Sequence, residues 1–341
     1  MRFRSLCSLL AAAGLLASCA PVPEEPAQQT QTAESVRRSQ RMAPDPAGPP
    51  RPAGSVLEEP GAVEPSHLDT DDVIGSLRPD DTPPAERVPQ ITERGRLIVG
   101  IDQSQNLLSF RNPVSGQLEG FEVDLAREIA RDIFGNSNAV DFRFIEAGER
   151  ENSLLEGTVD VVISTMSITQ ERQEILEFST PYMNANVRML TVQGSGIRNY
   201  EDLASRTVCI GEGSTSLEHA RRHAPDSTLL LTRRWSDCLM ALQQNQADAI
   251  ISDNTVLSGI AAQDPFTHLT GSSLGQEHYG VAIARDSEKL NSGGLVRQVN
   301  ATIERLQEDG TWWTMFDRWF GPYLTSLGPP DLNYREESID E

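Results

Sequence analysis

Several signatures are scarce or missing in this sequence, and each one excludes a class of function. The five histidines do not cluster at ligand spacing and no Cys-x-x-Cys pair occurs, so a metal site is not expected. Lys289 is the only lysine, and the net charge of −21 disfavours nucleic acid or an anionic membrane surface as a partner. After residue 17, no segment is long and apolar enough to span a bilayer.

The first residues have the pattern of an export signal. Arg2 and Arg4 precede an apolar run from Leu6 to Leu16, which is too short for a permanent membrane helix. The run ends in Leu-Ala-Ser-Cys, which resembles the lipobox of bacterial lipoproteins. We therefore predict a signal peptide over residues 1–18 and lipidation of Cys19, which would anchor the protein to the outer face of the cell membrane.

The next segment, residues 19–90, is rich in proline, glutamate and glutamine and almost free of aromatic residues. Such a composition buries too little apolar surface to offset the entropy of ordering. We predict a disordered, Pro-rich tether.

From residue 91 the chain alternates apolar runs with helical spacing, which indicates an α/β fold with a mainly parallel sheet in each of two lobes. The expected strands of the first lobe are residues 96–101, 140–145 and 159–163, and those of the second are 207–210, 229–231 and 247–252.

The strand at 159–163 is followed by a run of hydroxyl side chains that includes Ser164, Thr165 and Ser167. Thr169 is a candidate helix N-cap, and Arg172 follows in the first turn. Free N–H groups, hydroxyls and an arginine suit a carboxylate or a phosphate. The alternative is an ordinary capped helix whose arginine pairs with a surface glutamate.

Two further segments carry polar groups at such strand ends, where ligands of open sheets bind. Asp102 follows the first strand, and Asp253 follows a strand of the second lobe, although an N-cap role for Asp253 is the plainer alternative. The loop Gly213–Ser216 opens a helix but lacks the Gly-Lys-Ser/Thr ending of a nucleotide-binding loop, so we expect no nucleotide and no other cofactor.

Three motifs together carry a family resemblance. They are G-F-E-V-D-L-A-R-E-I-A at 120–130, S-T-M-S-I-T-Q-E-R at 164–172 and F-S-T-P-Y at 178–182. From about Gly95 to Trp319 the sequence resembles the solute-binding proteins of bacterial amino-acid ABC importers, and especially the glutamine/glutamate-binding lipoproteins of actinobacteria.

This resemblance implies a type II periplasmic-binding-protein fold, whose lobes are joined by a two-strand hinge. The implied boundaries are residues 91–193 plus 285–327 for the first lobe and 194–284 for the second, followed by a tail over 328–341. The hinge is expected near 192–196 and 276–281.

The resemblance also implies an amino acid gripped between the lobes. Arg172, Ser167 and Thr215, with Ser214 beside it, would hold the α-carboxylate, and Asp253 would hold the ammonium group. Arg188 lies in an otherwise apolar strand, where an unpaired charge is costly, so we predict that it meets a distal carboxylate. Glutamate or aspartate is then preferred over glutamine; pairing of Arg188 with a surface carboxylate is the alternative.

The expected partner is an ABC permease, with a membrane sensor as the alternative. We expect a monomer without catalytic activity; a dehydratase on the same fold is the less favoured possibility.

Two cysteines remain once Cys7 leaves with the signal and Cys19 is lipidated. Cys209 and Cys238 both lie in the second lobe and in an oxidising compartment, so we predict a disulfide between them.

Overall fold

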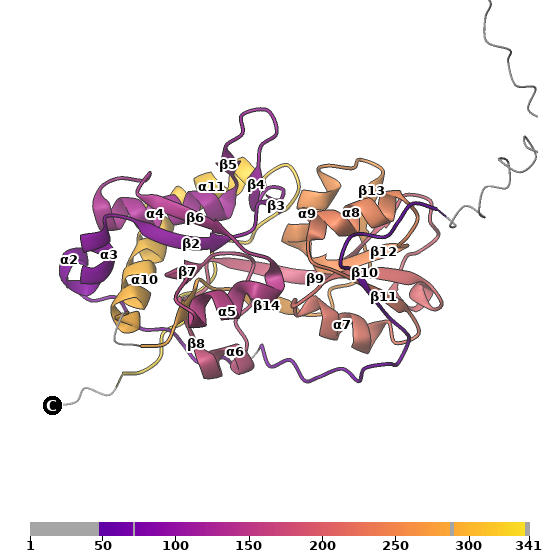
Figure 1. The fold of residues 1–341 in the computed structure, drawn as a ribbon, viewed down its shortest axis with the longest axis horizontal. Coiled ribbons are helices and arrows are strands. Elements are labelled where there is room, and N and C mark those ends of the chain that lie inside the picture. Colours follow the sequence, from indigo (N-terminus) through magenta and orange to yellow (C-terminus); the bar gives the residue numbers. More distant parts are fainter. Residues whose placement is uncertain (1–47, 71, 287–289, 338–341) are drawn as a thin grey trace, which may run out of the picture. The chain divides into compact units, whose positions relative to one another are not determined.

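The computed structural model describes residues 48–70, 72–286 and 290–337, and the chain from Pro49 onward forms one compact unit. This unit contains two large sheets, each covered by helices (Figure 1). We call the part built on the five-stranded sheet the first lobe and the part built on the seven-stranded sheet the second lobe.

The first lobe has the strand order β6-β2-β7-β15-β8. Its strands are β2 (Leu97–Ile101), β6 (Val140–Phe144), β7 (Val161–Val162), β8 (Leu176–Phe178) and β15 (Ala282–Ala284). Its helices are α2 (Pro84–Arg87), α3 (Pro89–Arg94), α4 (Phe121–Phe134), α5 (Arg150–Leu155), α6 (Gln170–Ile175), α10 (Ser292–Glu308) and α11 (Thr311–Trp319), with a 3-10 turn η1 (Ala147–Glu149). A small sheet of β3 (Ser104–Gln105), β4 (Ser109–Arg111) and β5 (Leu118–Glu119) precedes α4.

The second lobe has the order β1-β11-β10-β12-β9-β13, with β14 paired to β9. Its strands are β1 (Val56–Glu58), β9 (Met183–Val192), β10 (Thr207–Gly211), β11 (Thr228–Thr232), β12 (Ala249–Asp253), β13 (Thr267–Thr270) and β14 (Gln276–Tyr279). Its helices are α7 (Ser216–His223), α8 (Trp235–Gln243) and α9 (Asn254–Ala261), with a 3-10 turn η2 (Tyr200–Leu203).

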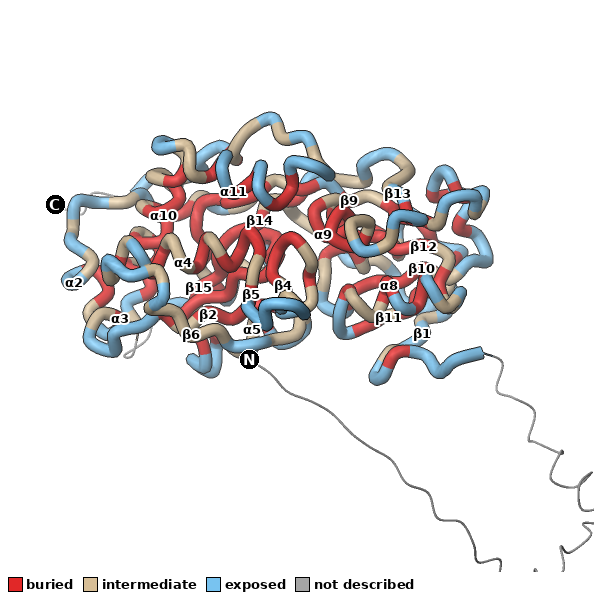
Figure 2. Tube along the Cα trace, turned by 90° about the horizontal axis from the view of Figure 1, so that it is seen from above, coloured by how far each residue is buried: buried red, intermediate tan, exposed pale blue. Residues whose placement is uncertain are grey.

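Hydrophobic periodicity explains why these elements form. In α4, Phe121, Leu125, Ile129 and Ile133 recur at helical spacing, and all four are buried. Figure 2 shows that burial is concentrated along the strands of both sheets, while the connecting loops are exposed. The predicted two-lobed α/β fold is confirmed. The second-lobe sheet is parallel at its centre and antiparallel toward both edges, whereas the first-lobe sheet is parallel from β6 to β7 and antiparallel from β7 to β15.

The first hinge crossing lies earlier than predicted. Residues 187–191 of β9 pair with β12, so this strand belongs to the second lobe instead of the first. The chain therefore crosses just before Met183, and not near 192–196. It returns between β14 and β15, and the β9–β14 pair, Met183 opposite Tyr279, forms the two-strand link. Because strand pairing is non-local, the sequence periodicity of β9 did not show which sheet it joins.

The predicted tether and tail are wrong in part. Residues 19–47 lie outside the described residues, but the chain from Pro49 onward packs on both lobes. Strand β1 pairs antiparallel with β11, and Ser76 forms a bridge with Tyr334 of the predicted tail. The composition of this segment cannot build a core of its own, yet an existing sheet edge and helix surface supply partners for its backbone.

The predicted disulfide joins Cys209 of β10 to Cys238 of α8, and both residues are fully buried. It closes a loop that contains β11 and ties α8 to the centre of the second sheet.

Candidate functional site

The carboxyl ends of strands from both lobes face one another at a polar cleft. The loop after β7 leads into α6 on one side, and β12 and the start of α7 lie on the other. The Ser167 and Thr215 hydroxyl oxygens are 3.5 Å apart across the cleft. Gly213, at φ +70°, approaches so closely that an added Cβ would lie 3.1 Å from Gly148 Cα. The two lobes therefore touch across the cleft.

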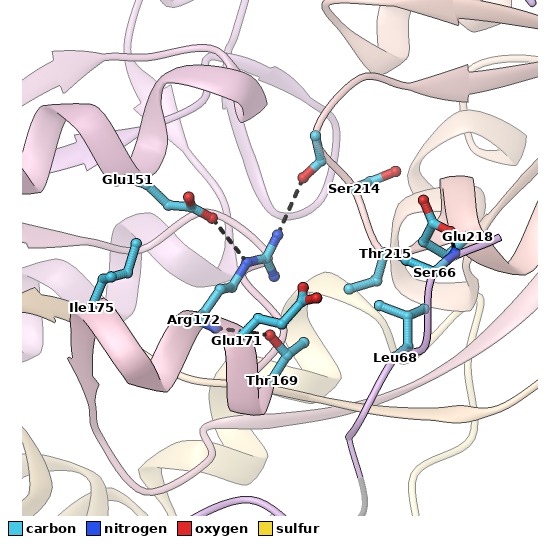
Figure 3. A pocket seen from close by; sticks show the side chains of 11 residues that line it. Ser66, Leu68, Glu151, Thr169, Glu171, Arg172, Ile175, Ser214, Thr215 and Glu218 are labelled. Atoms are coloured by element: carbon cyan, nitrogen blue, oxygen red, sulfur yellow. Dashed lines mark hydrogen bonds and ion pairs between the residues drawn. The ribbon is translucent and has the colours of Figure 1, made fainter. Parts of the chain in front are cut away.

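Arg172 projects from α6 toward this junction (Figure 3). The Thr169 side chain caps the helix by accepting from the Arg172 backbone N–H at 3.2 Å. The guanidinium donates to the Ser167 carbonyl at 2.8 Å and, across the cleft, to the Gly213 carbonyl at 3.2 Å. It also contacts Glu151 at 3.3 Å. Some of the guanidinium N–H groups thus donate to neutral carbonyl oxygens. A carboxylate is a stronger acceptor, so an anionic ligand would replace these carbonyls.

Asp253 ends β12 and is 5% exposed. It does not cap α9 through its side chain, so the structure does not support the plain N-cap alternative. Its Oδ2 accepts from the Tyr279 hydroxyl, whereas Oδ1 is buried without a hydrogen-bond partner. Burial, together with the nearby Glu277 carboxylate, raises the pKa of Asp253 to about 7. A buried carboxylate oxygen without a donor is suited to an ammonium group.

Arg150, which the sequence analysis missed, lies behind Arg172 at the start of α5 and is 3% exposed. Its guanidinium donates to four carbonyl oxygens, those of Ala147, Ser164, Thr165 and Gly213, at 2.8 to 3.3 Å. No carboxylate of the described residues forms an ion pair with it. Burial, and then the charge of Arg172, lowers its pKa to about 10. The only signal in the sequence was that Arg150 follows the predicted strand at 140–145. The carboxyl end of that strand lies at the same edge of the sheet as those of the other predicted parallel strands.

Glu122 is the second residue that the sequence analysis missed. It is fully buried in α4 and accepts from the Tyr182 hydroxyl and from the Thr165 backbone N–H, both at 2.6 Å. Thr165 has φ +43°, a left-handed conformation that is costly for a β-branched residue. Glu122 holds this strained loop in place, and burial raises its own pKa to about 7.

Two cavities lie along the cleft. The inner cavity has a volume of about 10 Å³ and the outer cavity about 220 Å³. The inner cavity is lined by Ala147, Arg150, Thr165, Ser167, Arg172, Ser214, Thr215, Trp235, Ser252, Asp253 and Val256. Such a volume holds about one water molecule, so entry of an amino acid requires the lobes to part.

Six of the nine predicted ligand-binding residues line the inner cavity, and three do not. Ser164 contributes only its carbonyl, which faces Arg150. Asp102 accepts from the Ser104 backbone and hydroxyl, which commits it to a local turn. Arg188 lies in β9 directly opposite Ser252, and its buried Nε has no hydrogen-bond partner. Paired residues of adjacent strands share a face, so Arg188 lies beside the lining residue Ser252.

Within the described part of the chain, no group of His, Cys, Asp and Glu side chains is arranged to hold a metal ion. No helix there has both the length and the apolar character to cross a bilayer.

Known proteins of similar sequence and structure bear on this site. A family model of bacterial extracellular solute-binding proteins, family 3, matches residues 97–322. The chain is 30% identical over 230 residues to the ABC transporter glutamine-binding protein GlnH of Bacillus subtilis, covering 67% of this chain and 82% of that protein. It is 28% identical over 268 residues to the glutamate-binding protein GluB of Corynebacterium efficiens, covering 72% and 86%.

Among solved structures, a mutant of ArgBP from T. maritima matches with a TM-score of 0.62 and 27% identity, covering 68% of this chain and 98% of that one. Two lobes, a two-strand link and a polar cleft define a bilobed binding protein. The chain belongs to family 3 of the bacterial extracellular solute-binding proteins. This membership supports the prediction that it is not an enzyme.

The raised pKa values of Asp253 and Glu122 predict how stability depends on pH. Both groups keep in the folded state protons that the unfolded chain releases above pH 4 to 5. The folded state thus binds more protons up to about pH 7, so the free energy of unfolding of the ligand-free protein should fall as pH rises through this window. Asp253→Asn should flatten that fall.

Urea unfolding at pH 5, 6 and 7 measures the effect. Asp331→Asn, which changes an exposed aspartate, is the control and should keep the wild-type pH profile. Identical profiles for Asp253→Asn and wild type would contradict the assignment.

Proposed function

We propose that this protein binds an acidic L-amino acid, glutamate or aspartate, in the cleft and delivers it by hinge closure to an ABC importer. Family membership and the relatives that are named as glutamine- and glutamate-binding proteins support the amino-acid class and the importer. The contacts of Arg150, and the position of Arg188 opposite the lining residue Ser252, support the acidic side chain.

The observation that carries the proposal is the burial of Arg150 without an ion pair among the described residues. It is buried, it donates only to carbonyls, and no described carboxylate pairs with it. Burying an unpaired charge is costly, so an anionic group of the ligand would relieve that cost. The cavity lining holds Arg150, Arg172 and Asp253, and Glu151 pairs with Arg172 beside it. A zwitterion adds no net charge to this lining, whereas a dicarboxylate adds one negative charge that can face Arg150.

Each end of the ligand then has a partner. Arg172, Ser167, Ser214 and Thr215 hold the α-carboxylate between α6 and the start of α7. Asp253 receives the ammonium group through its free Oδ1.

The distal carboxylate lies toward Arg150, with Arg188 approaching from behind Ser252. Thr165 lines the cavity, and Ser164 supports it through its carbonyl. Asp102 stabilises the local turn at Ser104 and has no proposed contact with the ligand.

Calorimetry of the wild-type protein against the twenty amino acids tests the function itself. Arg172→Ala should weaken binding of L-glutamate by at least about thirtyfold, because loss of a charge-assisted contact costs about 2 kcal/mol or more. Thermal unfolding checks that the fold persists. Arg143→Ala, a change of an exposed arginine on β6, is the control and should bind normally. Wild-type affinity in a folded Arg172→Ala protein would refute the role of Arg172.

The side-chain preference has its own test. Wild-type protein should bind L-glutamate about tenfold or more tightly than L-glutamine, which corresponds to about 1.4 kcal/mol. Arg188→Gln should narrow that ratio while α-carboxylate binding persists, and Arg206→Gln, on an exposed surface pair, should leave it unchanged. Equal affinities for the two ligands in the wild type would favour a glutamine-binding protein instead.

We further propose that the protein is held at the outer face of the cell membrane by a lipid on Cys19, which lies outside the described residues. The motif Leu16-Ala-Ser-Cys supports this anchor. Expressed with its signal peptide, the wild-type chain should partition into the detergent phase of a Triton X-114 extract, and Cys19→Ala should partition into the aqueous phase. Aqueous partitioning of both would contradict the anchor.

A further inference from the structure

Residues 59–70 and 72–76, which together we call the strap, run from the second lobe to the first (Figure 1) and pass the outer cavity of the cleft. The strap precedes the region that the family model matches, which begins at residue 97. Hydrogen bonds fix it to both lobes, and two of its residues, Ser66 and Leu68, line the outer cavity together with Arg172 and Thr215 (Figure 3).

The second-lobe end of the strap is held at two places. Just before it, β1 pairs with β11, and Glu58 forms a bidentate ion pair with Arg221 of α7 at 2.8 and 2.6 Å. Further along, the Ser66 backbone N–H donates to Glu218, and the Ser66 carbonyl accepts from Arg222 at 2.7 Å. The first anchor is half-buried and multiple, whereas the second consists of two exposed hydrogen bonds.

The first-lobe end is held by α6 and β8. The Asp69 carbonyl accepts from the Gln170 backbone N–H at 3.1 Å. The Gln173 side chain makes two hydrogen bonds with the backbone of Ile74, at 2.8 and 2.7 Å. The Ser76 hydroxyl donates to the Phe178 carbonyl at 2.6 Å. Since α6 also carries Arg172, this end of the strap is fixed to the helix that forms the ligand site.

The crossing between the two lobes is very short. Ser66 is bonded to α7 and Asp69 to α6, and the three residue-to-residue steps between them span at most about 11 Å when fully extended. The lobes cannot part at this mouth beyond that limit while both ends stay docked. Ligand entry into the inner cavity requires parting, because that cavity holds only about one water molecule.

We propose that the strap is a latch on cleft opening, released at Ser66, that controls how fast ligand enters and leaves. Once the contacts of Ser66 with Glu218 and Arg222 break, the chain between the remaining anchors runs from Glu58 to Asp69 and can span at most about 40 Å, with β1 still in place. The lobes can then open without loss of the sheet pairing. This inference rests on the proposed function only for its ligand readout.

The test adds slack to the crossing of the full-length protein. Six glycines inserted between Leu68 and Asp69 keep both docking sites but lengthen the short span. The matched control carries the same six glycines between Val63 and Glu64, which leaves the crossing from Ser66 to Asp69 at its native length. Arg222→Ala, which removes one contact of the latch, is a second and milder variant whose chain length is unchanged.

Two measurements follow. Solution X-ray scattering of the ligand-free proteins should give a larger radius of gyration for the Leu68–Asp69 insertion than for its control. Stopped-flow measurement should show L-glutamate leaving the Leu68–Asp69 variant about tenfold faster than the control, which corresponds to about 1.4 kcal/mol. Arg222→Ala should change both quantities in the same direction but by less.

An equal radius of gyration and an equal dissociation rate in the Leu68–Asp69 insertion and its control would overturn the latch. A wild-type protein that binds no amino acid would overturn the proposed function instead, and the scattering comparison would still decide the question of the latch. The two failures are thus distinguishable.

Discussion

The cleft depends on one electrostatic constraint, the burial of the Arg150 cation where the two lobes meet. A guanidinium held only by carbonyl dipoles is solvated but not neutralised, and its neighbour Arg172 carries the same charge. Both arginines lie in the first lobe, and closure without an anion removes water from them with Glu151, Glu122 and Asp253 as the nearby carboxylates. The acidic ligand that we propose would supply a negative charge at this place and would therefore stabilise the closed arrangement more than the open one. Such a difference in affinity is what any ligand needs to shift a conformational equilibrium.

Backbone geometry keeps these charges where the ligand would lie. The carbonyls that surround Arg150 come from η1, from the loop after β7 and from the start of α7, so both lobes contribute. The loop after β7 is itself strained at Thr165, and the buried Glu122 carboxylate, with Tyr182, holds it. A residue of α4 thus determines the position of groups on a different element. Asp253 completes the site from the opposite lobe, with one oxygen satisfied by Tyr279 and the other free.

Much of this arrangement was predictable from the sequence, and the misses have physical reasons. The positions of Ser167, Arg172 and Asp253 at the cleft were predictable because an apolar strand that ends in polar residues is a local pattern, and ligand sites of open sheets lie at such ends. The position of Thr215 at the cleft was implied by the family resemblance. Arg150 and Glu122 were missed because a charged residue in the first turn of a helix is ordinarily expected to be exposed to solvent. Only the tertiary packing shows that these two side chains are buried. The lobe that contains β9 was misassigned because pairing depends on residues 60 positions away, as in Met189 with Ile251. Residues 49–90 were predicted to be a tether because composition shows only whether a segment can form a core of its own. It does not show whether the segment packs on the rest of the protein.

The docked strap and the ligand act on the same equilibrium. The strap has its full set of contacts, through Ser66 and Asp69, only when α6 and α7 are close. The proposed ligand, held by Arg172 of α6 and Thr215 at the start of α7, would require the same approach. Linkage makes such effects reciprocal, so a strap that favours closure raises ligand affinity by the same factor by which ligand favours strap docking. A segment at the mouth of the cleft thereby contributes to affinity through α6 and α7. The free-energy difference between the open and closed forms would then include the contacts of the strap as well as those of the ligand.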